Sequence, residues 1–99
     1  MKVTINSVHF KADKKLETFI SSKVEKLHTL FEGSIGSEVT LRLENSESPD
    51  NKVSEIRLLI PGNDLYARKQ CTTFEEATDQ AVEALKKQLI KYKEKIRGI

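Results

Sequence analysis

The sequence predicts an α+β fold in which a four-stranded mixed sheet carries two helices packed on one face, in the order β-α-β-β-β-α. Two stretches repeat apolar residues at helical spacing, four short stretches alternate apolar and polar residues, and turn-forming residues separate them. Because the first strand reaches the second through a helix, these two strands are expected to run parallel, and the last three strands form an antiparallel meander. Both helices then cover the same face of the sheet.

The strands are predicted from alternation. Val3-Thr4-Ile5-Asn6 opens the chain, and Val8-His9-Phe10 resumes the alternation one place out of phase, which predicts a β-bulge near Asn6-Ser7. A polar turn over 45–51 and a hairpin turn at 61–64 are predicted between the later strands. Those strands are predicted around Val39–Leu43, Ile56–Ile60 and Leu65–Cys71. Lys69 falls on the inner face of the last strand, near its end, where its head group is expected to reach solvent.

The helices are predicted from capping residues and apolar stripes. Asp13 is a suitable N-cap for the first helix, and Gly33 and Gly36 are expected to end it and begin a loop. Thr73 and Glu76 form a capping box for the second helix, which should run for about six turns. The predicted core stripes are Leu16, Phe19, Ile20, Val24, Leu27 and Phe31 in the first helix, and Phe74, Ala77, Thr78, Ala81, Val82, Leu85, Leu89, Tyr92 and Ile96 in the second.

Length and composition indicate one domain. The chain has 99 residues, of which 37% are hydrophobic and 32% charged, a size that suits one hydrophobic core. No apolar run approaches the ~20 residues that cross a membrane, and the N-terminus lacks the apolar segment of a signal peptide. The single cysteine, Cys71, has no internal partner for a disulfide, which fits a reducing compartment. We therefore expect a cytoplasmic protein without a membrane contact.

Basic residues are concentrated in one segment. The whole chain carries +2, whereas residues 86–97 hold six basic residues against one glutamate. At 100° per residue, Lys86, Lys93 and Arg97 fall on one flank of the apolar stripe, and Lys87, Lys91 and Lys95 fall on the other. In the first helix, Lys15, Lys23 and Lys26 share a flank. Like charges one turn apart repel each other, so a polyanion contact is favoured over a merely solvated face.

If the two helices lie side by side, one lysine flank of each is expected to face a common groove. Helices that carry lysines on a three-stranded meander resemble the double-stranded RNA-binding domain in plan, with one extra strand at the N-terminus. Such surfaces recognise the shape and phosphates of A-form RNA rather than its base sequence.

The sequence does not predict an enzyme. His9 and His28 have no histidine or cysteine at metal-ligand spacing, and Cys71 has no activating residue near it in the sequence. The segment Gly33-Ser34-Ile35-Gly36 lacks the Gly-Lys-Ser/Thr ending of a phosphate-binding loop and follows a helix rather than a strand. We expect no catalytic residue, metal, cofactor or small-molecule substrate.

Three motifs, in their order and spacing, resemble a known family. They are the opening strand Val3-Thr4-Ile5, the segment Lys23-Val24-Glu25-Lys26-Leu27, and the segment Lys87-Gln88-Leu89-Ile90-Lys91-Tyr92-Lys93-Glu94-Lys95. The whole chain is similar to the short ribosome hibernation-promoting factors, also called ribosome-associated inhibitors or ribosomal subunit interface proteins. An older name is the sigma-54 modulation protein family, although nothing in the sequence resembles a polymerase-binding motif. Asp79 also matches, but Thr73-Phe74-Glu75 stands where the family often has Asp-Met-Tyr.

The resemblance implies binding in the decoding channel of the small ribosomal subunit, over the places of messenger RNA and of transfer RNA anticodon ends. The protein would contact ribosomal RNA and neighbouring ribosomal proteins, inhibit translation when growth stops and stabilise idle ribosomes. Long family members carry a further C-terminal dimerisation domain. Residues 1–99 resemble the short form, a single ribosome-binding domain without it. The expected RNA-binding residues are Lys23, Lys26, Lys86, Lys87, Lys91, Lys93 and Lys95.

A second hypothesis belongs to another functional class. In it, the chain is a small protein-binding adaptor that uses the open face of its sheet, and the basic helix is merely solvated. Salt separates the two hypotheses, because the affinity of a phosphate contact falls steeply as salt rises, whereas an apolar surface does not behave in this way.

Overall fold

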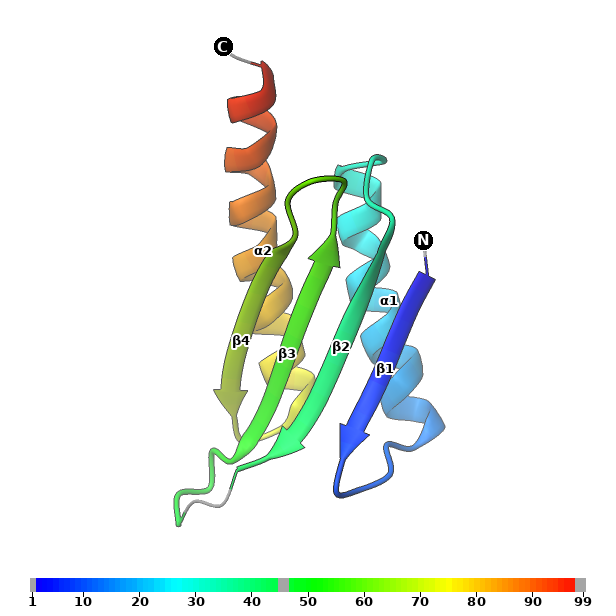
Figure 1. Ribbon diagram of the computed structural model, residues 1–99. Coiled ribbons are helices and arrows are strands. Elements are labelled where there is room, and N and C mark those ends of the chain that lie inside the picture. The colour runs from blue at the N-terminus through cyan, green and yellow to red at the C-terminus, as the bar shows by residue number, and fades with distance from the viewer. Residues whose placement is uncertain (1, 45–46, 98–99) are drawn as a thin grey trace.

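The computed structural model describes residues 2–44 and 47–97 and has the predicted order of elements (Figure 1). The elements are β1 Lys2–Val8, α1 Lys14–Leu30, β2 Gly36–Leu43, β3 Lys52–Leu59, β4 Leu65–Cys71 and α2 Phe74–Arg97. The strands lie in the order β1-β2-β3-β4. β1 and β2 are parallel, and the other neighbouring strands are antiparallel. The predicted α+β fold with a mixed sheet is therefore confirmed.

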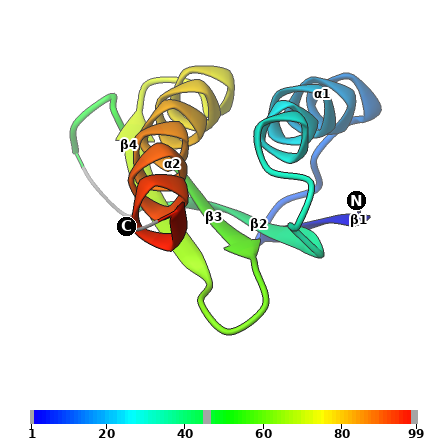
Figure 2. The ribbon, with the colours of Figure 1, turned by 90° about the horizontal axis from the view of Figure 1, so that it is seen from above.

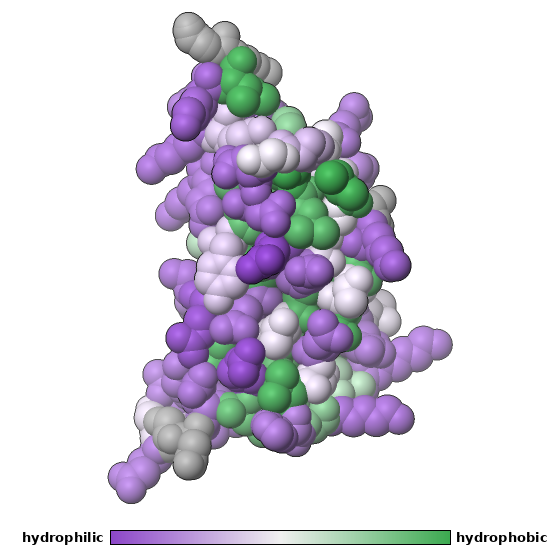
Figure 3. Space-filling model, viewed as in Figure 1, coloured by the Kyte–Doolittle hydropathy of each residue, from purple (hydrophilic) through white to green (hydrophobic). Residues whose placement is uncertain are grey.

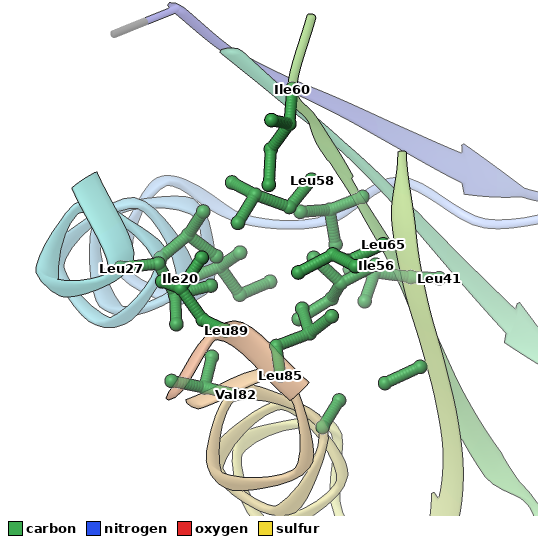
Figure 4. Close-up of a cluster of buried hydrophobic side chains, with 14 of the residues drawn as sticks. Ile20, Leu27, Leu41, Ile56, Leu58, Ile60, Leu65, Val82, Leu85 and Leu89 are labelled. Atoms are coloured by element: carbon green, nitrogen blue, oxygen red, sulfur yellow. The ribbon is translucent and has the colours of Figure 1, made fainter. Parts of the chain in front are cut away.

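Both helices lie on one face of the sheet and run side by side (Figure 2). Their apolar stripes meet the inner face of the strands in one cluster of buried side chains (Figure 4). The fully buried members include Ile20, Leu27, Leu41, Ile56, Leu58, Leu85 and Leu89. No helix of the described residues covers the opposite face of the sheet, so this part of the chain forms two layers with one open sheet face.

β1 pairs with β2 without the bulge predicted near Asn6-Ser7. The register is unbroken over all seven residues of β1. His9 follows the strand with a φ of 66°, a left-handed conformation that turns the chain. Phe10 then packs against the core, and its ring stacks on Phe74 with centroids 4.9 Å apart. The prediction was wrong because the change of phase comes from a turn after the strand and not from an inserted residue.

The predicted helix starts are confirmed. The Asp13 carboxylate accepts a hydrogen bond of 2.8 Å from the Leu16 backbone N–H, and the Thr73 hydroxyl accepts one of 3.0 Å from the Glu76 backbone N–H. Each bond satisfies a backbone donor that the first turn of a helix leaves without a partner.

The prediction that Gly33 and Gly36 end α1 was wrong in its detail. The helix ends at Leu30, and Phe31 caps it with an extended backbone. Gly36 is the first residue of β2, and a Cβ there would lie 2.8 Å from the Lys2 carbonyl oxygen. Glycine is needed at this position because the two parallel strands approach closely, and not because a helix stops.

The predicted hairpin at 61–64 joins β3 to β4. Gly62 adopts a φ of 79°, which favours glycine, and the Asn63 N–H donates to the Ile60 carbonyl at 3.1 Å. The other predicted turn, over 45–51, includes Asn45 and Ser46, which lie outside the described residues. Its remaining residues belong to neither flanking strand.

The last turns of α2 extend beyond the end of the sheet (Figure 1). Ile96 was predicted to join the core stripe, but its side chain is 57% exposed. The reason is the length of the helix, since neither the sheet nor α1 reaches this far. Tyr92, one turn earlier, still packs against the core.

Candidate nucleic-acid interface

Aromatic contacts hold the two helices side by side. Phe31, at the end of α1, meets Tyr92 of α2 edge-on, with ring centroids 5.7 Å apart and planes at 87°. At the other end, Phe10 of the β1–α1 connection stacks on Phe74, the first residue of α2. These contacts fix which flank of α2 faces α1, and they therefore determine where each lysine lies.

Four of the predicted RNA-binding residues lie where the helices face each other: Lys23, Lys26, Lys86 and Lys93, called here the inter-helix lysines. The Lys23 ammonium lies 3.1 Å from an Asp79 carboxylate oxygen of α2. The Lys93 ammonium donates a hydrogen bond of 3.0 Å to the Leu30 carbonyl at the end of α1. Both contacts join one helix to the other, so these two lysines already help to hold the fold together.

The remaining inter-helix lysines differ in their surroundings. Lys86 forms an ion pair with Glu83 at 3.1 Å, one turn earlier in α2. Lys26 follows Lys23 by three residues, which places it on the same flank of α1, and its side chain is exposed. Asp79 and Glu83 therefore offset part of the positive charge between the helices.

The other flank of α2 carries Lys87, Lys91 and Lys95, called here the outer-flank lysines. All three side chains are exposed. Within residues 2–44 and 47–97, none of the three makes an ion pair or a side-chain hydrogen bond. Gln88 of the same flank donates a hydrogen bond of 2.8 Å to the Tyr66 backbone carbonyl of β4. This bond fixes the flank above β4 and away from α1.

The structure divides the predicted site residues into two groups, and their contact with RNA stays a prediction. Lys23, Lys26, Lys86 and Lys93 lie toward the α1–α2 boundary, whereas Lys87, Lys91 and Lys95 lie on the other flank of α2. An open hollow that includes Lys87 lies beside α2 and is lined by Lys69, Asp79, Gln80, Glu83, Ala84 and Lys87. One lysine flank of each helix therefore faces the α1–α2 boundary, and the second lysine flank of α2 has a different neighbour, β4.

Three residues that shape this region were not among the predicted site residues: Asp79, Glu83 and Gln88. The pairing of Asp79 with Lys23 joins residues 56 positions apart, so no local pattern signals it. The hydrogen bond of Gln88 to the Tyr66 carbonyl could not be predicted either, because it depends on which flank of α2 meets β4. Glu83 was detectable, because its three-residue spacing from Lys86 is the usual spacing of a helical ion pair.

The open face of the sheet carries an ion-pair network. Glu55 of β3 lies 3.2 Å from Arg42 of β2 and 3.3 Å from Arg68 of β4, and it accepts a hydrogen bond of 3.3 Å from the Tyr66 hydroxyl. Arg68 also pairs with Glu44 at 2.8 Å. Figure 3, viewed from this side, shows a mainly hydrophilic surface with scattered apolar residues. The charged groups of this face are therefore largely matched to one another.

The titratable groups of the described residues show two shifted pKa values. Burial raises the pKa of the Cys71 thiol, and Glu76 adds to the effect, so the nucleophilic thiolate is disfavoured there. Burial and the neighbouring Glu55 carboxylate raise the pKa of Tyr66. Within the described ranges, no group of three or more histidine, cysteine, aspartate or glutamate side chains is placed to hold a metal ion. In the same ranges no helix is both long enough and apolar enough to cross a membrane.

The same fold occurs in solved structures, among them the following two proteins. A ribosomal subunit interface protein from Coxiella burnetii has a TM-score of 0.82 at 15% sequence identity, covering 94% of this chain and 98% of the other. The N-terminal domain of Protein Y from Thermus thermophilus has a TM-score of 0.80 at 18% identity, covering 93% of this chain and 99% of the other. At these identities the likeness establishes the fold alone.

Comparison with curated protein sequences gives no match. The model of the family described as sigma 54 modulation protein / S30EA ribosomal protein matches residues 3–97. The match includes both helices and all four strands, apart from the first residue of β1. It confirms the resemblance that the three sequence motifs indicated, and the chain belongs to the sigma 54 modulation protein / S30EA ribosomal protein family.

Proposed function

We propose that this protein binds the small ribosomal subunit in the decoding channel, inhibits translation and stabilises idle ribosomes in the cytoplasm. Family membership supports a ribosomal partner. The observation that carries the proposal is the row of outer-flank lysines, which are exposed and have no partner within the described part of the protein. The contact is made with ribosomal RNA and with ribosomal proteins beside it.

The geometry of the outer-flank lysines suits phosphate groups. Lys87 and Lys91 are four residues apart in α2, which sets them about 6 Å apart along the helix axis, close to the spacing of successive phosphates along one strand. The ammonium group of lysine is a point charge on a flexible stem and needs no fixed fork geometry. A row of such charges therefore follows a phosphate backbone without reading its base sequence.

The inter-helix lysines form the second part of the proposed RNA-binding surface. Lys26 is free to contact phosphate, whereas Lys23, Lys86 and Lys93 must first exchange an internal partner for the RNA. This exchange reduces the net gain, because an existing ion pair or hydrogen bond breaks when the new one forms. We therefore assign the larger share of the affinity to Lys87, Lys91 and Lys95.

The adaptor hypothesis receives less support. It requires an apolar surface on the open sheet face, and the charged network around Glu55 occupies the middle of that face instead. Tyr66 is a large, half-exposed side chain there, but its hydroxyl is engaged with Glu55. The ribosome-binding hypothesis is thus the one that the charge distribution favours.

The test is a double charge reversal, Lys87→Glu with Lys91→Glu. Both side chains point away from the core, so the circular dichroism spectrum should not change. Binding to purified small subunits should weaken by at least about tenfold, since each reversed charge replaces an attraction to phosphate with a repulsion. Inhibition of a cell-free translation reaction should be relieved. In a salt series, the slope of log affinity against log salt should flatten by about 0.7–0.9 for each phosphate that the variant no longer neutralises.

The matched control is Lys11→Glu with Lys14→Glu, which changes the net charge by the same amount. These two exposed residues lie at and just before the start of α1, away from residues 87–91 of α2. The control should bind the small subunit nearly as well as the wild type. Equal losses in the two variants would show that binding follows net charge alone. Unchanged binding in both would reject the RNA contact and favour the adaptor hypothesis.

A further inference from the structure

Lys69 of β4 is a basic residue that the proposed function does not yet use. Ala67 and Cys71, two residues before and after it, are buried, so the Lys69 side chain leaves the strand on the face that the helices cover. It is nevertheless exposed, because β4 is an edge strand and a lysine stem can carry its ammonium group out to water. Within the described ranges Lys69 makes neither an ion pair nor a side-chain hydrogen bond, so its charge is available to an external anion.

The register of the sheet places Lys69 beside the early turns of α2. Lys69 lies opposite Ser54 of β3, and the buried Ser54 hydroxyl accepts a hydrogen bond of 3.1 Å from the Thr78 hydroxyl of α2. Three residues earlier in β4, the Tyr66 carbonyl accepts the hydrogen bond from Gln88. These two contacts fix how α2 lies along β4, and they therefore fix where the Lys69 side chain meets the helix.

Lys69 and Lys87 line the same open hollow beside α2. The lining also includes Gln80 and Ala84, which fall on the same flank of α2 as Lys87 at 100° per residue. Both of these residues are neutral, so the helix places no competing charge on that flank ahead of Lys87. The two ammonium groups, one from the strand and one from the helix, can therefore act on one bound anionic chain.

Two carboxylates, Asp79 and Glu83, also border the hollow. An Asp79 oxygen lies 3.1 Å from the Lys23 ammonium, and a Glu83 oxygen lies 3.1 Å from the Lys86 ammonium. These pairs offset the negative charge of the hollow, whereas its two lining lysines have no such partner in the described part of the chain. The positive charge that remains for a ligand is thus on the β4 side.

We propose that Lys69 binds a phosphate of the same RNA strand that the outer-flank lysines follow, so that the contact continues from α2 onto β4. This inference rests on the proposed function and extends its binding site to a second element. On the helix, the row of one-turn steps stops at Lys87, because the position four residues earlier is Glu83. Lys69 supplies the next positive charge from the sheet, and the flexible stem of lysine suits a contact that needs no fixed geometry.

The test compares Lys69→Gln with Lys2→Gln. Each variant removes one positive charge from an exposed side chain, and the two positions lie on opposite edge strands of the sheet. The affinity of Lys69→Gln for purified small subunits should fall about threefold or more, and the slope of log affinity against log salt should flatten by about 0.7–0.9, as expected for the loss of one phosphate contact. Lys2→Gln should bind like the wild type, and so should Lys69→Arg, which keeps the charge.

A second measurement needs no substitution. The wild type is treated with an amine-acetylating reagent, both free and bound to small subunits, and mass spectrometry follows the modification of each lysine. Lys69 and Lys87 should be protected together in the complex, whereas Lys2 should stay as reactive as in the free protein. A Lys69 that reacts in the complex as readily as Lys2 would overturn the inference.

The outcomes separate this inference from the proposed function. If Lys87→Glu with Lys91→Glu loses affinity while Lys69→Gln binds like Lys2→Gln, the inference alone is overturned. A loss of affinity in Lys69→Gln without a flatter salt slope would indicate a contact with ribosomal protein and would overturn it as well. If the wild type does not bind small subunits, the proposed function and the inference fail together.

Discussion

The two flanks of α2 carry the same residue type but differ in their contacts within the protein. On the flank that faces α1, Lys86 pairs with Glu83 and Lys93 binds the Leu30 carbonyl. On the flank above β4, Lys87 and Lys91 are exposed and without a partner in the described residues. Two rows of lysine that look equivalent in the sequence thus differ in what is left for a ligand. The comparison teaches that the tertiary contacts of a charge, and not its presence in the sequence, decide whether it remains available to a ligand.

The largest effect on stability is expected midway between the two flanks, at Leu85. This side chain is fully buried among the core residues, so Leu85→Ala should lower the free energy of unfolding by about 2–5 kcal/mol, through reduced burial and the cavity it leaves. Lys91→Ala should change that free energy by less than about 0.5 kcal/mol, as is usual for a surface position. Urea denaturation measures both. Similar losses in the two variants would mean that the apolar face of α2 is assigned wrongly.

A smaller loss of stability should separate the two flanks directly. Lys93→Met keeps most of the apolar stem but removes the hydrogen bond to the Leu30 carbonyl, and it should cost about 0.5–1.5 kcal/mol. Lys91→Met on the outer flank removes no such bond and should leave the urea midpoint unchanged. Small-subunit binding should show the reverse order, with the larger loss at Lys91. If Lys93→Met proved neutral for stability, the structural role of the inter-helix lysines would have to be abandoned.

Asp79→Asn tests whether pairing with acidic residues keeps the inter-helix lysines from contacting phosphate. The Lys23–Asp79 pair is well exposed, with side chains 30% and 50% accessible, so solvent screening limits its contribution to at most about 1 kcal/mol. Small-subunit affinity should change less than about threefold, because we assign most of the binding to the other flank. A clear increase in affinity would instead show that Lys23, once released from Asp79, is a principal phosphate contact.

The smallest effect is expected on the open sheet face. Charged side chains pair with one another there, as Lys23 and Asp79 do between the helices. Burial and the Glu55 carboxylate raise the pKa of Tyr66 above its ordinary value of 10.0. The folded state therefore favours the protonated phenol. Its contribution to stability is complete below the unfolded pKa and disappears as the pH rises through the folded one. In a Tyr92→Phe background, ultraviolet titration should show that Glu55→Gln lowers the pKa of Tyr66, and an unchanged pKa would contradict the contact.

Much of the fold was determined by local signals in the sequence. The period-two strands, the helical stripes, the Asp13 cap and the capping box at Thr73 all predicted elements that the structure contains, because local hydrogen bonding and burial of one face select the same residues. The errors came where local patterns are ambiguous. A change of phase after Asn6 fits a bulge or a turn equally well, and Gly36 fits a helix stop or a close approach of strands.

The sequence by itself determined that α2 is basic and that its lysines lie in two rows beside an apolar stripe. Only the tertiary structure decided which row meets α1 and which lies above β4. The reason is that helical periodicity fixes angles around one axis but not the neighbours at each angle. Those neighbours come from contacts distant in the chain, such as Phe31 with Tyr92 and Gln88 with the Tyr66 carbonyl, and they leave Lys87 and Lys91 as the charges that remain free for a partner.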